Sequence, residues 1–341
     1  MSKVLFCAAD CHLERCLRNR PVFKEDSAKA FRSMCENIVG HKASEKALII
    51  AGDVLDKNYA TGAGLQVLAE SFDYLWRNHI KVYTIMGNHD ADTASIPEIE
   101  GAVNLDKNLI DILGWKVYGL DFRPSDILRK ELESVPECDL LVLHQPFHHL
   151  LSFEGASDLT VEDIPPQVNN VLCGDVHTTD VFEMSENRYF VSPGSLHPVK
   201  LDENVDHGFM MYDGKKWEFS KIPTRTIYRK HILSDEDVED LKKLDNEDLK
   251  GAVIEIKYLR SFESAVSSFQ TKHPEAEFIV SGEAESVIGD ETSPGRVSSS
   301  MTDRLKDVVS PDKKPEMYSF TYRLLTENPS KVVQERMAKF M

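Results

Sequence analysis

The sequence lacks three features that mark familiar classes of protein. It has no run of about eighteen apolar residues, so no segment is suited to cross a membrane as a helix. Its six cysteines form no CxxC pair, and Cys7, Cys138 and Cys173 lie in or beside apolar runs, which favours reduced thiols in a cytosolic protein over disulfides or a zinc knuckle. Basic residues are also few, 40 against 57 acidic ones, and the net charge of −17 is unlike that of a stand-alone nucleic-acid-binding protein. A polyanionic substrate would have to be held by metal ions, by a small basic patch or by a partner protein.

The sequence does contain a regular alternation of short apolar runs and amphipathic helical stretches, as far as about residue 170. The pattern predicts strands at 3–9, 47–51, 81–86, 139–144 and 169–174, and helices at 24–39 and 64–77. Two hairpin patterns follow, at 181–192 and 209–222. Alternating units followed by hairpins indicate a layered α/β domain whose later strands form a second sheet.

The composition changes near residue 231, where we expect a domain boundary. An acidic helical stretch precedes a strand–helix–strand pattern, which indicates a small separate α+β domain. The expected organisation is a main domain at 1–230, a small domain at 231–288, a flexible linker at 289–300 and a C-terminal helical segment at 301–341. The C-terminal segment contains more aromatic and aliphatic residues than a free tail needs.

Polar residues gather where five of the expected strands end. The segments are Asp10-Cys11-His12, Gly52-Asp53-Val54-Leu55-Asp56, Gly87-Asn88-His89-Asp90, His144-Gln145-Pro146 and Gly174-Asp175-Val176-His177. One such segment would more often be a turn or a helix cap, but five together favour a ligand site at the carboxyl edge of a sheet. Oxygen and imidazole donors without thiolates suit Mn²⁺, Fe²⁺ or Zn²⁺. The candidate ligands are too many for one ion and fit two ions that share a carboxylate, an arrangement used for phosphate ester hydrolysis.

In this order, the five segments resemble the motifs of the calcineurin-like metallophosphoesterases, over roughly residues 3–225. The resemblance implies a four-layer α/β/β/α sandwich. Four segments are similar to the SbcD branch of that family: His144-Gln145 at the end of its apolar run, 192–198, 207–212 and 222–225. That branch supplies nuclease subunits of double-strand-break repair, including short forms encoded by tailed phages. By this resemblance, residues 231–288 would be a capping domain and 301–341 would dock on the coiled coil of an SbcC-type ATPase.

The family resemblance also implies a role for each motif residue. One metal ion would be held by Asp10, His12, Asp53 and His177. The second would be held by Asp53, Asn88, His144 and Asp175. A hydroxide between the ions would attack phosphorus in line, and His89 would donate a proton to the leaving oxygen or stabilise the transition state. Asp56 would hydrogen-bond His89 and fix its tautomer, with a helix cap as the alternative role.

Asp175 departs from the family pattern, because the family usually has His at this position. Either Asp175 ligates the second ion or that site is weakened. We expect ligation, and we expect Mn²⁺ or Mg²⁺ to serve better than Zn²⁺ because a carboxylate favours harder ions.

A dense basic cluster follows the first motif, and its members are candidates for contacts with DNA phosphates: Arg15, Arg18, Arg20 and Lys24. His197, in the segment 192–198, is a further candidate. The alternatives are a solvated loop for the basic cluster and a simple turn around His197.

The metal-ligand pattern and the family resemblance together imply a metal-dependent DNA nuclease that uses two divalent ions, Mn²⁺ foremost with Mg²⁺ as the alternative. It would work in DNA end processing, repair or recombination with an SbcC-type ATPase, as a homodimer within that complex. Its place would be the cytoplasm, or the host cytoplasm if a phage encodes it. Two alternatives stay open. An enzyme of the same fold that hydrolyses small phosphoesters would not need the region after residue 231, and a non-catalytic scaffold would not need intact Asp53, Asn88 and His89.

Overall fold

The computed structural model of the protein describes residues 2–56, 62–90, 102–151, 157, 159–203 and 205–283. These residues belong to one compact unit, Met1–Glu283, and a second unit, Ala284–Met341, lies outside them. The linker and the C-terminal segment expected at 289–300 and 301–341 therefore stay predictions.

A first sheet of six strands begins at the N-terminus. Its parallel strands are β1 (Lys3–Ala8), β2 (Glu45–Ala51), β3 (Lys81–Ile85) and β4 (Ala102–Asn104). The hairpin of β11 (Gly208–Tyr212) and β12 (Trp217–Lys221) joins it antiparallel to β1, which gives the order β12-β11-β1-β2-β3-β4. The hairpin expected at 209–222 is thus confirmed.

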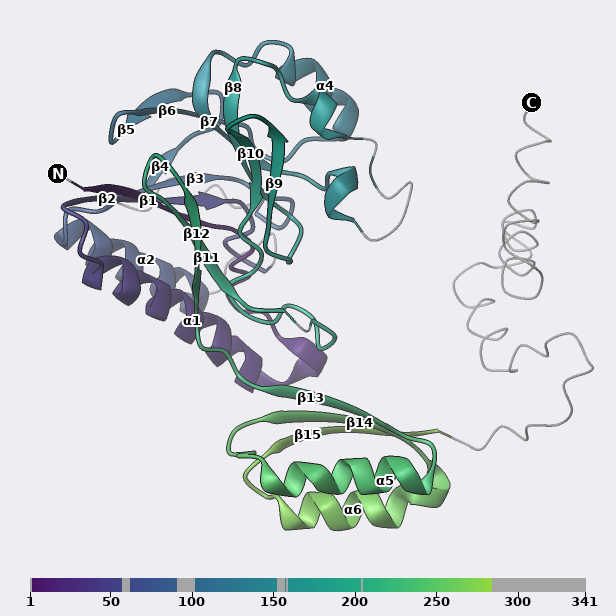
Figure 1. The fold of residues 1–341 in the computed structure, drawn as a ribbon. Helices are drawn as coiled ribbons and strands as arrows, with labels where there is room; N and C mark the ends of the chain where they lie inside the picture. The colour runs from purple at the N-terminus through teal and green to yellow at the C-terminus, as the bar shows by residue number, and fades with distance from the viewer. Residues whose placement is uncertain are drawn as a thin grey trace, which may run out of the picture. The chain divides into compact units, whose positions relative to one another are not determined.

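Two helices cover one face of this sheet, α1 (Pro21–Gly40) and α2 (Gly62–Arg77) (Figure 1). Proline at the start of α1 suits a position whose N–H needs no partner. Phe31 of α1 and Phe72 of α2 are fully buried in one core with Phe6 and Leu48 of the strands. The amphipathic faces that predicted these two helices therefore pack against the sheet.

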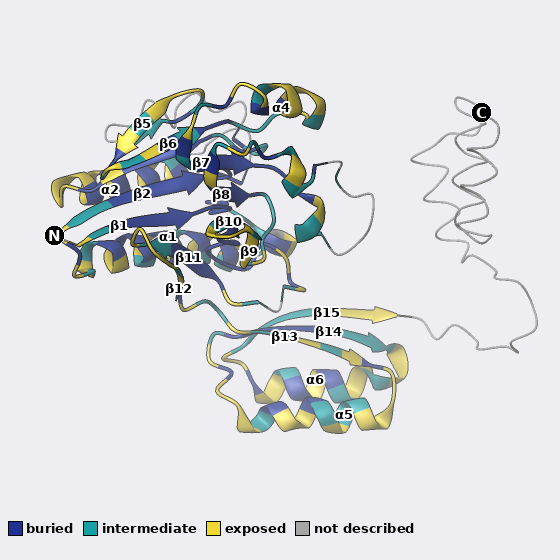
Figure 2. Cartoon of the chain, turned by 45° about the horizontal axis from the view of Figure 1, so that its top comes forward, coloured by how far each residue is buried: buried dark blue, intermediate teal, exposed yellow. Residues whose placement is uncertain are grey.

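A second sheet of six strands packs against the other face of the first. Its order along the sheet is β5 (Leu109–Ile112), β6 (Trp115–Gly119), β7 (Cys138–His144), β8 (Val168–Gly174), β10 (Arg188–Ser192) and β9 (Asp180–Ser185). Strands β1, β2, β7 and β8 are buried along most of their length (Figure 2). One core, which contains Leu5, Ile49, Val142 and Leu172, fills the space between the sheets. Runs buried on both faces explain why these strands are continuously apolar in sequence.

The outer face of the second sheet is covered by α4 (Ser125–Leu132). Leu128 and Leu132 of this helix pack in a core with Leu141 of β7 and Val171 of β8. The layers are therefore helices, sheet, sheet and helix. The predicted four-layer α/β/β/α sandwich is confirmed.

Residues 227–283 form a third, smaller sheet of parallel strands with two helices on one face. The elements are β13 (Ile227–Ile232), α5 (Asp235–Lys242), β14 (Val253–Leu259), α6 (Glu263–Lys272) and β15 (Glu277–Glu283). The strand–helix–strand pattern expected after residue 231 is present, but the strands are parallel with helices between them, so this part is an α/β unit and not the expected α+β one. The expected boundary falls inside β13. Val253 of β14 packs with Leu17 and Phe23, so this part shares a small apolar cluster with the N-terminal region. No helix in the described part of the chain is long and apolar enough to span a membrane.

Candidate metal centre

The five polar segments lie at the carboxyl ends of β1, β2 and β3 in the first sheet and of β7 and β8 in the second. Four of their residues adopt left-handed backbone conformations: Asp10 (φ 49°), His12 (φ 39°), Asp53 (φ 51°) and Asp175 (φ 85°). Such conformations cost a non-glycine residue roughly 1–3 kcal/mol, and they cluster at functional sites where the surrounding structure imposes them. Four of the ten non-glycine residues with positive φ in the described part of the chain therefore belong to these polar segments, which supports this edge as the candidate site.

Glycines within the motifs leave room for the polar side chains of the site. A Cβ on Gly87 would overlap the Asp53 carboxylate, and one on Gly174 would lie 2.6 Å from Nδ1 of His144. Gly52 is pressed against the same imidazole and has a φ of 83°. The glycines therefore let the motif backbones close around Asp53 and His144.

Asp10, His12 and His177 form one group of candidate metal ligands, with three ligand atoms within 4.8 Å of one another. Oδ1 of Asp10 lies 3.8 Å from Nε2 of His12 and 3.9 Å from Nε2 of His177. Nε2 of His12 is also 3.6 Å from Oδ2 of Asp53. The structure thus brings together the four residues expected to hold the first ion.

His144 is the centre of a second group. Its Nε2 atom lies 3.4 Å from Oδ2 of Asp53, 3.8 Å from Oδ1 of Asp175 and 3.2 Å from Oδ1 of Asn88. Its Nδ1 faces the carbonyl oxygen of Ala51 at 2.7 Å, so a proton on Nδ1 leaves Nε2 free to ligate. The residues expected to hold the second ion are therefore also neighbours, and Asp53 Oδ2 belongs to both groups.

The donors fit divalent ions. Among the described residues, neither ring nitrogen of the buried His12 has a hydrogen-bond partner, a costly state that coordination would relieve. Two atoms that are each about 2.1 Å from one ion lie roughly 3.0–3.4 Å apart, close to the separations seen here. Burial raises the pKa of Asp10 to about 7, although His144 and His177 lower it. A cation at this position would stabilise the ionised carboxylate.

His89 lies beside the two ligand groups with 35% of its side chain exposed, so a substrate can reach it. Its Nε2 atom is 4.0 Å from Oδ2 of Asp53, and its Nδ1 is 2.8 Å from the backbone carbonyl oxygen of Asp56. The predicted contact between Asp56 and His89 is therefore made by a backbone carbonyl. The Asp56 carboxylate instead accepts a 2.9 Å hydrogen bond from Arg15.

Two carboxylates that support the site had no role in the sequence analysis. Asp90 is buried and accepts hydrogen bonds from three backbone N–H groups, of Val54 (3.1 Å), Leu55 (3.0 Å) and Gly87 (3.1 Å). It ties the second motif to the third, and its place within that motif was a usable signal. Glu203 lies 2.8 Å from Nδ1 of His177, and no sequence pattern marks it.

Three arginines of the basic cluster are paired with acidic groups of the chain. The pairs are Arg15–Asp56 (2.9 Å), Arg18–Glu255 (3.6 Å) and Arg20–Glu277 (3.0 Å). Arg18 and Arg20 thereby connect the N-terminal region to β14 and β15. Lys24 is exposed and has no ion pair within the part of the chain that the structure describes. Contacts between this cluster and DNA stay a prediction, and Arg15 is the least exposed of the three arginines.

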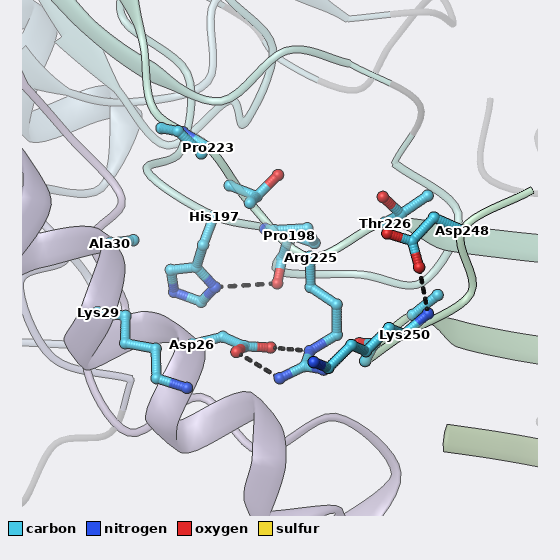
Figure 3. A pocket seen from close by; sticks show the side chains of 13 residues that line it. Asp26, Lys29, Ala30, His197, Pro198, Pro223, Arg225, Thr226, Asp248 and Lys250 are labelled. Carbon is cyan, nitrogen blue, oxygen red and sulfur yellow. Dashed lines mark hydrogen bonds and ion pairs between the residues drawn. The ribbon is translucent and has the colours of Figure 1, made fainter. Parts of the chain in front are cut away.

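His197 is buried, with 2% of its surface exposed, and its ring nitrogens face the carbonyl oxygens of Cys11 (3.0 Å) and Pro198 (3.1 Å). It lines a cavity of about 330 Å³ next to the pair formed by Asp26 and Arg225 (Figure 3). Burial lowers the pKa of His197 to about 4, so the ring is neutral at pH 7. These observations favour a structural role over the phosphate contact considered from the sequence.

Comparison with known proteins agrees with the motifs. Residues 3–179 match the family model described as calcineurin-like phosphoesterase. The chain is similar to the DNA double-strand break repair protein Mre11 of Archaeoglobus fulgidus, 25% identical over 283 residues that cover 69% of this chain and 62% of the relative. It is also similar to Mre11 of Methanosarcina acetivorans, 27% identical over 241 residues that cover 64% of this chain and 38% of the relative. The matched region thus spans less than two thirds of each relative's length.

One solved structure, that of the protein of unknown function AQ665 from Aquifex aeolicus, matches 42% of this chain and 81% of its own with a TM-score of 0.27 and 16% identity. A likeness at that level supports no conclusion. The family model, by contrast, covers more than half of the chain and includes all five polar segments. The chain belongs to the calcineurin-like phosphoesterase family.

Proposed function

We propose that the protein is a nuclease that hydrolyses phosphodiester bonds of DNA with two divalent metal ions. Its family makes it a metal-dependent phosphoesterase. The observation that carries the two-ion proposal is the position of Asp53. A single carboxylate oxygen lies 3.6 Å from Nε2 of His12 and 3.4 Å from Nε2 of His144, so one residue can serve both ligand groups.

Paired divalent ions, when bound, acidify water and offset the negative charge of a phosphodiester. The chain would hold one ion through Asp10, His12, Asp53 and His177. It would hold the other through Asp53, Asn88, His144 and Asp175. His89 would present Nε2 to the leaving oxygen, because its Nδ1–H is directed at the Asp56 carbonyl. In the imidazolium form, Nε2 carries the proton that would be donated.

Two observations support DNA as the substrate. The relatives from A. fulgidus and M. acetivorans are named as DNA double-strand break repair proteins. Residues 227–283 add a layer that hydrolysis of a small phosphoester does not require, and we propose that they act as a capping domain. The third carboxylate of the centre, Asp175, supports Mn²⁺ or Mg²⁺ over Zn²⁺.

We also propose that the protein works as a dimer with an SbcC-type coiled-coil ATPase, which residues 301–341 would bind. That segment lies outside the described residues. The net charge of −17 supports the need for a partner, because the field of the protein opposes the approach of DNA.

The test is cleavage of labelled duplex and single-stranded DNA with Mn²⁺ or Mg²⁺, with and without the ATPase. Asp53→Asn is the inactive control, and bis(4-nitrophenyl) phosphate is the small-substrate comparison. Cutting of DNA by the wild type and not by the variant supports the proposal. Hydrolysis of the small diester with DNA left intact under every condition would favour a small-substrate phosphodiesterase instead.

A further inference from the structure

His177 is oriented by a carboxylate that lies outside every motif. Oε1 of Glu203 is 2.8 Å from Nδ1 of His177, so the Nδ1 proton is donated to Glu203 and Nε2 faces Asp10. The two side chains are only 17% and 11% exposed, which shields the bond from water. A carboxylate in this position fixes the tautomer and ring orientation of an imidazole that ligates a metal.

His12 has a corresponding carboxylate beside its Nδ1 atom. Oδ1 of Asp56 lies 3.6 Å from that nitrogen, an attraction that favours a proton on Nδ1 and leaves Nε2 for the metal. Asp56 accepts a 2.9 Å hydrogen bond from a terminal nitrogen of Arg15. The Asp56 side chain is 6% exposed and that of Arg15 28%, so Arg15 both neutralises Asp56 and holds it in place.

One residue joins these two arrangements. The N–H of Val199 donates to Oε2 of Glu203 at 2.6 Å, and the carbonyl oxygen of Val199 accepts from Nε of Arg15 at 3.0 Å. Val199 is 1% exposed. A continuous series of polar contacts therefore runs from His177 through Glu203, Val199 and Arg15 to the carboxylate beside His12.

We propose that Arg15 and Glu203, joined through Val199, act as one brace that orients His12 and His177 toward the same metal ion. The inference rests on the metal centre of the proposed function and adds two positioning residues to it. Both histidines belong to the ligand group of the first ion, whereas His144 of the second group is oriented by the Ala51 carbonyl. The brace therefore acts on one of the two ions.

The test uses the full chain, freed of metal with a chelator and titrated with Mn²⁺, with bound ions counted by electron paramagnetic resonance and affinities measured by calorimetry. The variants are Glu203→Gln and Arg15→Gln. The amide introduced by Glu203→Gln retains one acceptor oxygen where the carboxylate serves two donors, so either His177 or Val199 loses its partner. We expect each variant to bind one ion roughly 10–100-fold more weakly and the other as the wild type does.

Matched controls remove the same charges nearby. Asp202→Asn neutralises an exposed neighbour of Glu203, and Arg18→Gln removes an exposed guanidinium of the same segment. We expect both controls to bind two ions with wild-type affinity. A second readout needs no metal: ¹⁵N shifts of the imidazoles should show His177 with its proton on Nδ1 in the wild type, and a changed tautomer population in Glu203→Gln.

The double variant decides whether the residues act as one unit. If either change alone releases the brace, the double variant should lose no more metal affinity than the single variant that binds the ion more weakly. If the fold losses of metal affinity in the two single variants multiply in the double variant, the joint brace is overturned. It is also overturned if the single variants bind both ions normally while the wild type is an active nuclease. A wild type that binds two ions but cuts no DNA would overturn the nuclease proposal and leave the brace standing.

Discussion

Oδ1 of Asp53 accepts a 2.9 Å hydrogen bond from the backbone N–H of His89. The other oxygen of the same carboxylate faces the imidazoles of both ligand groups. One side chain therefore fixes the separation between the candidate acid and the candidate metal ligands. This coupling allows the roles of the motif residues to be tested separately.

Replacing His89 by Asn should leave both metal ions bound and lower turnover by roughly 10²–10⁴, the usual contribution of a positioned general acid. The backbone N–H that binds Asp53 is kept, so the ligands should stay in place. Metal content and hydrolysis of a chromogenic diester should be measured on the same samples. Loss of metal together with activity would show that His89 is itself a ligand.

Asp175 should be a ligand of the second ion, since its carboxylate lies 3.8 Å from Nε2 of His144. Asp175→Ala should lose one of the two ions and nearly all activity, whereas Asp175→His should keep both. The wild type should work better with Mn²⁺ or Mg²⁺ than with Zn²⁺, and the His variant should lose part of that preference. An Ala variant with two tightly bound ions and normal turnover would contradict the assignment.

The strands and the five ligand segments could be predicted because both depend on local patterns. An apolar run followed by Asp, Asn or His is visible in sequence, and the carboxyl ends of parallel strands meet at one edge. The partners of Arg18 and Arg20 could not be predicted, because Glu255 and Glu277 come from strands more than 200 residues later. Glu203 was missed for a different reason: it lies in a loop without a periodic pattern, 26 residues from His177 along the chain.

Asp90 should contribute to the stability of the fold, although the sequence pattern assigned it no role. Asp90→Asn keeps one acceptor oxygen and turns an amide donor toward the remaining backbone N–H, which should cost roughly 1–3 kcal/mol of the free energy of unfolding. Asp90→Ala leaves the N–H groups of Val54, Leu55 and Gly87 without this acceptor and should cost more. Urea unfolding of the metal-free protein measures both. Variants as stable as the wild type would show that water replaces the carboxylate.

Arg20 and Lys24 should separate structural from DNA-binding roles in the basic cluster. Arg20→Gln breaks a half-exposed pair with Glu277 and a bond to the Phe278 carbonyl, so we expect a small loss of stability, up to about 1 kcal/mol, and faster amide exchange in β15. Lys24→Gln should leave the stability and the amide exchange of β15 unchanged. It should lower the slope of log affinity for DNA against log salt concentration by about 1, as expected for the loss of one phosphate contact. An unchanged salt slope for Lys24→Gln, with a reduced one for Arg20→Gln, would reverse the assignment.

Removal of the chain from Ser298 onward should separate partner binding from hydrolysis. Every residue of the candidate metal centre lies at or before Glu203, within the compact unit that ends at Glu283, so the truncated protein should keep its two ions and its activity on a small chromogenic diester. Complex formation with an SbcC-type ATPase should be lost, because the apolar residues proposed to contact its coiled coil are removed: Leu305, Val308, Tyr318, Phe320, Tyr322 and Leu324. Co-purification and size-exclusion chromatography measure the first effect, and diester hydrolysis the second. A truncated protein that loses basal hydrolysis would show that the C-terminal segment completes the catalytic fold, and one that still binds the ATPase would place the contact before residue 298.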